Sequence, residues 1–408
     1  MPVNLEAPIK DELSPISGVK LGITSAGIKT QDRPDLVLIE LAEGTTTSAV
    51  YTQNAFCAAP VTLAKQHQEQ HSPHFLLINS GNANAGTGEA GMQTAQMCCQ
   101  SVAELSGLPA ESVLPFSTGV IGQQLPIDKI TQSMPAAYKN LAEDNWFDAA
   151  HSIMTTDIVA KAMSTQIEID GKTITITGMA KGSGMIRPDM ATMLSYIATD
   201  AAVEQSVLDD ILLRSVAQSF NRISVDGDTS TNDACVLVAT AKADNSEISV
   251  IDSLDAQNLY QAVAEVSQFL AHAIVRDGEG ATKFIAIEVE QGQDNEECRQ
   301  VAYTIAHSPL VKTALFASDP NWGRILAAVG RSGLSNFDLT KVAIYLDDVC
   351  IVDHGEPASS YTEDQGQRVM DQDEITIKVQ LGRGLADDTV WTCDFSYDYV
   401  KINAEYRT

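Results

Sequence analysis

The 408-residue chain is predicted to be a mixed α/β protein in which sheets are sandwiched by helices. Short apolar runs that read as strands alternate with segments whose apolar residues recur with the 3.6-residue helical period. This pattern continues into the last third without a short-period repeat, a low-complexity tract or a long linker rich in Pro and Gly. With 44% hydrophobic residues, the two halves are expected to pack as one body around a full core.

In the first half of the chain, the hydrophobic pattern predicts strands, a helix and a hairpin. Residues 35–41 and 75–78 are apolar runs of strand length, and residues 89–105 carry Met, Ala and Leu at helical spacing. Residues 164–177 form two alternating runs joined by an Asp-Gly pair at 170 and 171. Because Asp-Gly favours a type I′ turn, this segment is predicted to be a β-hairpin.

The second half continues in the same α/β style. The helical period returns in two long segments, and four further apolar runs read as strands. The helices are expected at residues 203–220 and 254–275, and the strands at 235–241, 284–289, 342–352 and 374–381.

Charge, hydropathy and cysteine usage exclude several classes of protein. A formal charge of -28 repels phosphate backbones and anionic lipid, so neither nucleic acid nor a membrane surface is expected as a partner. No apolar run approaches the roughly 20 residues of a membrane span, and the N-terminus lacks the regions of a signal peptide, so a cytoplasmic protein is expected. The seven cysteines include no CxxC pair, which favours buried thiols in a reducing compartment and no metal site.

Residues 178–194, GMAKGSGMIRPDMATML, crowd Gly, Lys, Arg, Asp and Thr between two strand-like segments. Glycines at 182 and 184 would let the backbone approach a ligand closely. The order is not that of a phosphate-binding loop, because the Lys precedes the glycines and does not follow them. The residue types alone leave two interpretations open, a reactive loop or a glycine-rich connection with incidental surface charges.

This segment closely resembles the self-processing segment of the ornithine acetyltransferase (glutamate N-acetyltransferase) family. Other blocks typical of that family follow in order along nearly the whole chain, which makes the resemblance specific. They lie at residues 78–85, 117–122, 154–157, 224–233, 277–280, 319–324 and 403–408.

The resemblance implies a chain that cuts itself between Ala191 and Thr192. Fragments 1–191 and 192–408 would then pack intimately in an N-terminal-nucleophile-like acetyltransferase fold. Thr192 would be the nucleophile of a ping-pong acetyl transfer from N-acetylornithine to glutamate, in the cyclic route of arginine biosynthesis. Its β-branching helps to hold the hydroxyl against the carbonyl before cleavage. The freed α-amine, with an ordinary pKa of about 7.7 to 8.0, could take the hydroxyl proton without a His partner.

Acyl transfer also needs hydrogen-bond donors aimed at the developing oxyanion. Thr118 and Gly119 follow the apolar run 113–116, so at a strand end they could offer a hydroxyl and a backbone N–H. By resemblance these two residues form the oxyanion hole. An ordinary Thr-Gly turn is the alternative that the residue types leave open.

The implied substrates carry an α-carboxylate and a charged side chain, so the site needs groups of both signs. Lys181 suits a carboxylate, and Glu279 suits an ammonium. By resemblance Thr155 contacts the substrate, although Thr156 beside it is an alternative because one sequence does not fix the register.

The resemblance adds Asn403 and Thr408 to the substrate-binding residues, besides Thr192 itself. The end of the chain would therefore fold back into the active site. This expectation runs against the usual tendency of chain ends to fray.

An acidic stretch, with Asp226, Asp228, Asn232 and Asp233, could suggest a site for a hard cation. The spacing lacks the order of a calcium-binding loop and its terminal Glu. Turn and helix-cap hydrogen bonds are the favoured interpretation, because Asp and Asn commonly make them.

No metal or organic cofactor is expected, because an ester on the nucleophile would store the acetyl group, although acetyl-CoA could serve as a co-substrate. The family resemblance further implies an assembly with two copies of each fragment. A self-processing N-terminal-nucleophile aminopeptidase of related fold is the alternative function. It would release amino acids to water, so the products distinguish the two.

Overall fold

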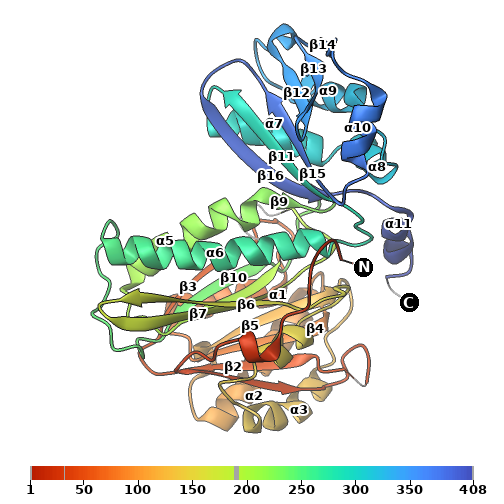
Figure 1. The fold of residues 1–408 in the computed structure, drawn as a ribbon. Coiled ribbons are helices and arrows are strands. Elements are labelled where there is room, and N and C mark those ends of the chain that lie inside the picture. Colours follow the sequence, from red (N-terminus) through yellow and green to blue (C-terminus); the bar gives the residue numbers. More distant parts are fainter. Residues whose placement is uncertain (1, 32, 188–192, 407–408) are drawn as a thin grey trace.

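The computed structural model describes residues 2–31, 33–187 and 193–406. Three β-sheets covered by helices form two lobes (Figure 1). The lower lobe in this view holds two stacked sheets with helices outside them, and the upper lobe holds the third sheet. The arrangement confirms the predicted α/β class with sheets sandwiched by helices.

The first sheet has four strands in the order β1-β2-β4-β5. Helices α1, α2 and α3 cover its outer face and share a buried core with it (Figure 1). Strands β4 and β5 run parallel, so that Ser80 lies beside Thr118. The elements are β1 (Val19–Thr24), β2 (Leu36–Leu41), β4 (Phe75–Asn82), β5 (Val113–Val120), α1 (Ala59–Gln70), α2 (Gly88–Ser106) and α3 (Ile127–Lys139), with 3₁₀ helices at Lys10–Glu12 and Ala110–Ser112.

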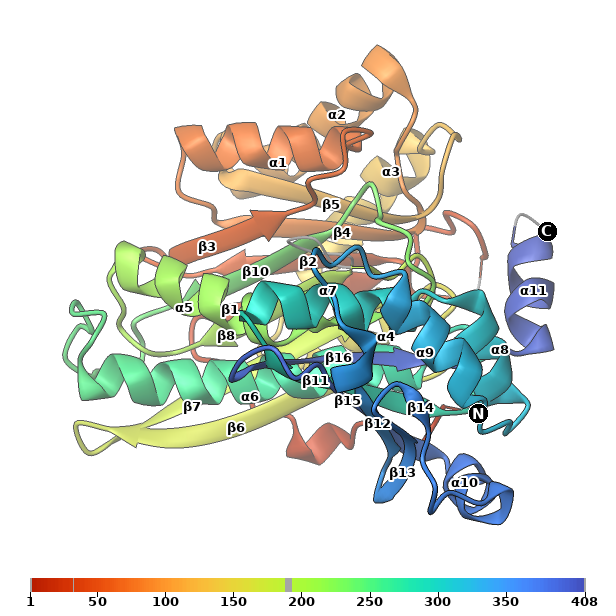
Figure 2. The same cartoon turned by 90° about the horizontal axis from the view of Figure 1, so that it is seen from above.

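The second sheet has five strands in the order β3-β10-β8-β7-β6. Helices α5 and α6 cross its outer face, as Figure 2 shows from above. Its inner face stacks on the first sheet, where the rings of Phe116 and Tyr196 meet edge to face at 5.3 Å between centroids. The elements are β3 (Thr46–Tyr51), β6 (Lys161–Ile169), β7 (Lys172–Lys181), β8 (Leu194–Thr199), β10 (Ala234–Ala239), α4 (Trp146–Ser152), α5 (Gln205–Gln218) and α6 (Leu254–Arg276), with a 3₁₀ helix at Phe220–Arg222.

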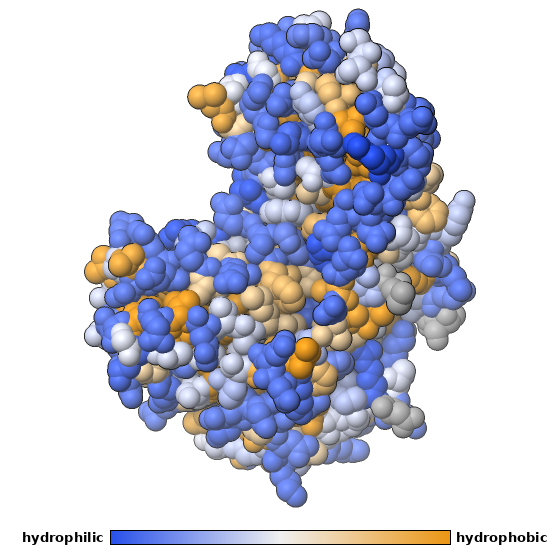
Figure 3. Space-filling view, viewed as in Figure 1, coloured by the Kyte–Doolittle hydropathy of each residue, from blue (hydrophilic) through white to orange (hydrophobic). Residues whose placement is uncertain are grey.

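The third sheet has seven strands in the order β14-β13-β12-β15-β11-β16-β9. It builds a separate buried core with its own helices, and its outer surface is mostly hydrophilic in the view of Figure 3. The strands are β9 (Ile223–Ser224), β11 (Phe284–Gly292), β12 (Ala343–Leu346), β13 (Val349–Asp353), β14 (Glu356–Pro357), β15 (Glu374–Gln380) and β16 (Ala386–Cys393). The helices are α7 (Asn295–Ala306), α8 (Pro309–Phe316), α9 (Trp322–Gly330) and α10 (Glu363–Met370), with a 3₁₀ helix at Leu339–Lys341. Helix α11 (Tyr397–Ala404) follows the third sheet and contributes no buried residue.

The predicted hairpin is confirmed, because β6 pairs with β7 and the turn residues Asp170 and Gly171 have φ of +53° and +70°. The other predicted helices and strands are present, with two corrections. Residues 342–352 are two antiparallel strands, not one, because Asp347 at a φ of +47° reverses the chain. Strand β5 continues beyond the apolar run to Val120, so the predicted oxyanion residues lie inside a strand and not at its end.

The predicted cut between residues 191 and 192 falls between β7 and β8, which are neighbours in the five-stranded sheet. Their antiparallel ladder begins where Lys181 pairs with Leu194. Strands β3, β6 and β7 come before the predicted cut, whereas β8 and β10 come after it. The predicted units 1–191 and 192–408 would therefore share one sheet, and their boundary does not coincide with the boundary between the lobes.

Candidate active site

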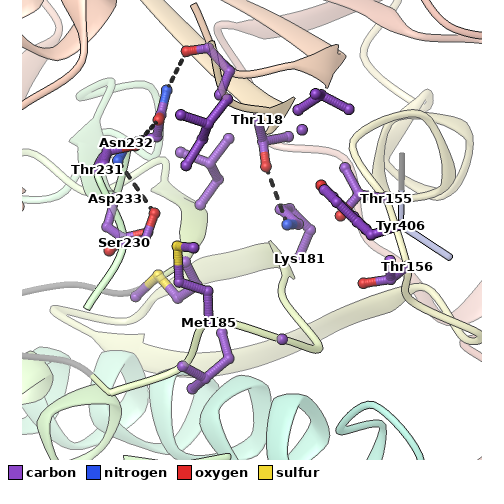
Figure 4. Close-up of a pocket in the computed structure, with 18 of the residues that line it drawn as sticks. Thr118, Thr155, Thr156, Lys181, Met185, Ser230, Thr231, Asn232, Asp233 and Tyr406 are labelled. Carbon is purple, nitrogen blue, oxygen red and sulfur yellow. Dashed lines mark hydrogen bonds between the residues drawn. The ribbon is translucent and has the colours of Figure 1, made fainter. Parts of the chain in front are cut away.

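A pocket opens beside the five-stranded sheet and is lined from both sides of the predicted cut (Figure 4). Thr118, Gly119, Thr155, Thr156 and Lys181 line it from the segment before residue 191, and Met193, Glu279 and Asn403 line it from the segment after. The fold thus brings together every described residue that the sequence singled out for catalysis or substrate binding.

Gly119 lets two strands approach each other closely at the pocket wall. Its φ is +133°, and a Cβ at this position would lie 2.3 Å from the carbonyl carbon of Gly81 in β4. Any other residue would strain the backbone and push the strands apart. The conformation of this predicted oxyanion residue is therefore one that requires glycine.

Thr118 is buried, and its Oγ1 accepts a hydrogen bond from Lys181 Nζ at 3.1 Å. A threonine hydroxyl has one hydrogen to donate besides its acceptor positions. Because the oxygen is already used as an acceptor, the hydrogen stays available for another group in the pocket. This geometry suits a donor to a developing negative charge.

Lys181 ends strand β7 with its side chain buried. Burial lowers the pKa of the Lys181 ammonium, and the negative charge of Asp157 opposes that shift. The contact with Thr118 was not foreseen from the sequence. The binding of a substrate carboxylate by Lys181 stays a prediction.

Thr155 and Thr156 both line the pocket (Figure 4). The backbone N–H of Thr155 donates to Asp157 Oδ2 at 3.0 Å, which fixes the turn that presents the two hydroxyl-bearing residues. The structure thus places both threonines at the site and does not choose between them.

Glu279 is 6% exposed and lines the pocket together with Thr118 and Gly119 of β5. Its Oε2 accepts a hydrogen bond from Asn403 Nδ2 at 2.8 Å. A Cβ at Gly184 would lie 2.4 Å from the carboxyl carbon of Glu279, so the glycine makes room for this carboxylate. The position of Glu279 therefore depends on two neighbours from distant parts of the chain.

The last part of the chain that the structure describes reaches the pocket. Asn403 and Tyr406 line it, although α11 has no buried residue. Lys29 Nζ donates to the Tyr406 carbonyl at 3.1 Å and lies 5.3 Å from the centre of the Tyr406 ring. Thr408, also predicted to bind substrate, lies outside the described residues.

Ala191 and Thr192, the predicted cleavage site and nucleophile, lie outside the described residues. The chain on either side of them is held by one acidic stretch. Asp226 accepts from the backbone N–H of Ile186 at 2.9 Å, and the backbone N–H of Ala234 donates to the carbonyl of Met193 at 3.0 Å. Asp226 thus has the backbone-bonding role favoured from the sequence.

Asp233 is a residue of the pocket wall that sequence reasoning did not assign to the site. It is 3% exposed, and burial raises the pKa of its carboxyl well above the usual range. Its Oδ2 has no hydrogen-bond partner among the described residues. Its neighbour Asn232 donates to the carbonyls of Ala83 and Ser117 at 2.6 and 2.9 Å. Asp233 belongs to the acidic stretch and to the family block 224–233, but neither signal distinguishes it from the turn-forming residues.

The described part of the chain contains no group of three or more His, Cys, Asp or Glu side chains placed to hold a metal ion. In residues 2–31, 33–187 and 193–406, no helix has the length and apolar character needed to cross a membrane. All seven cysteines are free.

Two stacked sheets with a strand hydroxyl, a buried ammonium and a buried carboxylate in one pocket are typical of an enzyme for a small charged substrate. The model of the ArgJ family matches residues 20–408. The chain therefore belongs to the ArgJ family, which confirms the family and the acetyltransferase class predicted from the sequence blocks.

Similar proteins cover the whole chain. The proteins named arginine biosynthesis bifunctional protein ArgJ from Pseudomonas fluorescens (strain Pf0-1) and Colwellia psychrerythraea (strain 34H / ATCC BAA-681) are 56% and 50% identical to it. The first alignment covers 97% of this chain and 98% of the relative, and the second covers 100% of both. The crystal structure of arginine biosynthesis bifunctional protein ArgJ from Bacillus halodurans is 39% identical, with a TM-score of 0.50. It covers 53% of this chain and 100% of the solved chain.

Proposed function

We propose that this protein cuts its chain between Ala191 and Thr192 and then moves an acetyl group from N-acetylornithine to glutamate. Membership of the ArgJ family and relatives named for arginine biosynthesis support the pathway. One observation carries the mechanism: Thr118, Lys181 and Glu279 line the same pocket as Met193, the first described residue after the predicted cut.

The comparison with the Bacillus halodurans structure supports the cut. That solved chain is matched completely by only 53% of this chain. A fragment that begins at Thr192 would also hold just over half of the 408 residues. A half-length chain is what cleavage near the middle of the sequence would give.

In the proposed cut, the Thr192 hydroxyl oxygen adds to the carbonyl carbon of Ala191. The C–N bond then breaks and the hydroxyl proton passes to the nitrogen, which leaves an ester on Thr192 and a free α-amine. One water molecule hydrolyses the ester, giving a carboxylate on Ala191 and restoring the hydroxyl. The new amine can then act as the base for its own side chain.

In acetyl transfer, the Thr192 hydroxyl oxygen adds to the acetyl carbonyl of N-acetylornithine while the α-amine takes the proton. Thr118 and Gly119 donate to the oxyanion, and the α-amine returns the proton to the departing nitrogen of ornithine. Glutamate attacks the acetyl ester by the same steps in reverse. Lys181 would bind the α-carboxylate and Glu279 the side-chain ammonium, because their charges are complementary.

Thr155, Asn403 and Thr408 complete the proposed substrate contacts. The ester itself stores the acetyl group between the two half-reactions, so the proposed chemistry needs no cofactor. The word bifunctional in the relatives' names fits a second activity, and we propose acetyl-CoA as a second acetyl donor to glutamate. The proposed assembly has two copies of each fragment, which the mass of the native complex would measure.

Incubation of the purified protein with N-acetylornithine and glutamate tests the function. We expect ornithine and N-acetylglutamate by mass spectrometry, and two fragments on denaturing electrophoresis, the second beginning at Thr192. The Thr192→Ala variant should stay one chain and transfer no acetyl. Transfer by an uncut chain would refute the mechanism, and release of amino acids from peptides without acetyl transfer would favour an aminopeptidase.

A further inference from the structure

A cluster of three ionisable side chains lies buried beside the pocket. Lys161 Nζ is 2.7 Å from Asp157 Oδ1 and 2.7 Å from Asp277 Oδ2, and all three side chains are 0% exposed. Burial would lower the pKa of Lys161, but the two carboxylates outweigh it and raise that pKa. Well-packed apolar residues often stabilise a fold at least as well as such a cluster, so stability alone does not explain it.

Asp157 connects the cluster to two substrate-binding segments before the predicted cut. Its Oδ2 accepts from the backbone N–H of Thr155 at 3.0 Å. Its Oδ1 accepts from the backbone N–H of Gly182 at 2.7 Å, directly after Lys181. The same carboxylate therefore fixes the backbone beside two residues proposed to contact the substrate.

Asp277 connects the cluster to the segment after the predicted cut. Its Oδ2 also accepts from the backbone N–H of Ile158 at 3.0 Å, and its carbonyl accepts from Ser183 Oγ at 2.6 Å. Two residues further on, the backbone N–H of Glu279 donates to the Ser183 carbonyl at 2.9 Å. The pair of Lys161 and Asp277 thus links the 155–161 segment to the turn that carries Glu279.

We propose that Asp157, Lys161 and Asp277 are positioning residues that set the distance between the carboxylate-binding and ammonium-binding sides of the pocket. This inference rests on the proposed function, in which Lys181 binds the α-carboxylate and Glu279 the side-chain ammonium. Through this distance the cluster determines which length of substrate fits the pocket. It favours the side chain of ornithine over that of lysine, which has one more methylene.

Two variants test whether the cluster determines the selectivity for substrate length. Asp277→Asn keeps the shape of the side chain, and its amide oxygen can still accept from the N–H of Ile158. The opposite charges of Lys161 and Asp157 then balance each other. Lys161→Met removes the shared ammonium at similar length. Lys283→Met is the matched control, because Lys283 is also buried but its ammonium donates to the carbonyls of Met370 and Gln372 in the upper lobe.

The measurement is kcat/KM with N-acetylornithine and with Nα-acetyllysine as donors to glutamate, on fully cut protein of each variant. Misplacement of a substrate by about 1 Å can cost about 100-fold in rate, and one methylene is worth about 10-fold to 200-fold in discrimination. We expect Asp277→Asn and Lys161→Met to lower kcat/KM for N-acetylornithine by about 100-fold and to reduce its preference over Nα-acetyllysine at least about 10-fold. Lys283→Met should lower the melting temperature and keep the preference.

An unchanged preference in the two cluster variants, or an equal loss in Lys283→Met, would overturn the inference. Should Lys161→Met not fold, Asp277→Asn alone decides, because it leaves no uncompensated lysine. Failure of the unaltered protein to make N-acetylglutamate would instead count against the proposed function. The two failures are thus distinguishable.

Discussion

Replacement of Thr118 by valine isolates the hydroxyl that faces Lys181. Valine has nearly the shape of threonine and favours a strand, so β5 should stay in place. The variant removes the proposed oxyanion donor and also the acceptor of the hydrogen bond from Lys181 Nζ.

Two magnitudes follow for Thr118→Val. Loss of one oxyanion donor lowers kcat by about 100-fold to 1000-fold, or about 2.7–4 kcal/mol of transition-state stabilisation. Loss of a hydrogen bond to a charged group costs about 1.5–3 kcal/mol of folding stability. The KM for N-acetylornithine should change much less than kcat, because the oxyanion exists only in the transition state.

Two controls separate these effects. Thr118→Ser keeps the hydroxyl and should keep most of kcat. Thr177→Val removes another buried hydroxyl, which donates to the Ser14 carbonyl at 2.7 Å and does not line the pocket. This variant should lower stability without the loss in kcat. The assay is steady-state transfer after cleavage has run to completion on a denaturing gel. A valine variant with the kcat of the serine variant, or with a change in KM alone, would refute the oxyanion role.

Three further perturbations have defined outcomes. Gly184→Ala places a Cβ 2.4 Å from the carboxyl carbon of Glu279, so we expect KM for N-acetylornithine to rise about 10-fold or more, and an unchanged KM would contradict the role of this carboxylate. Burial lowers the pKa of His272 and of His307 to about 4, so both are neutral in the folded protein at neutral pH. Their contribution to stability is full above about pH 6.5 and is lost as the pH falls towards 4, and a double His→Gln variant should flatten melting temperature against pH over that range. Truncation after Ile402 removes Asn403 and its hydrogen bond to Glu279, so kcat/KM should fall while electrophoresis still shows two fragments. Unaltered acetyl transfer would exclude residues 403–408 from the site.

Local signals predicted the local structure well. The Asp-Gly pair between alternating runs specified the β6–β7 hairpin, because the turn and the two strands are contiguous in sequence. The 342–352 segment was misjudged for the opposite reason. The chain reverses there because Asp347 has a left-handed conformation. Asp tolerates this conformation, but the presence of an Asp in a sequence does not predict it.

The residues of the pocket were predicted from family blocks, but their mutual contacts were not. Lys161 and Asp277 are 116 positions apart, and only the packing of three segments brings their charges together. Likewise, Lys181 looked like a binding residue, and only the stacking of the two sheets shows that its ammonium meets Thr118. Sequence patterns name such residues without saying which of them touch.

The five-stranded sheet mixes strands from both sides of the predicted cut, and this has a consequence for how the enzyme matures. In the proposed mechanism the pairing of β7 with β8 comes before the cut, because it brings Ile186 and Met193 to the pocket. A nascent chain that fails to form this sheet would never acquire its nucleophilic amine. Only correctly folded chains would then become active. Because both fragments come from one folded polypeptide, they would not need to associate from solution.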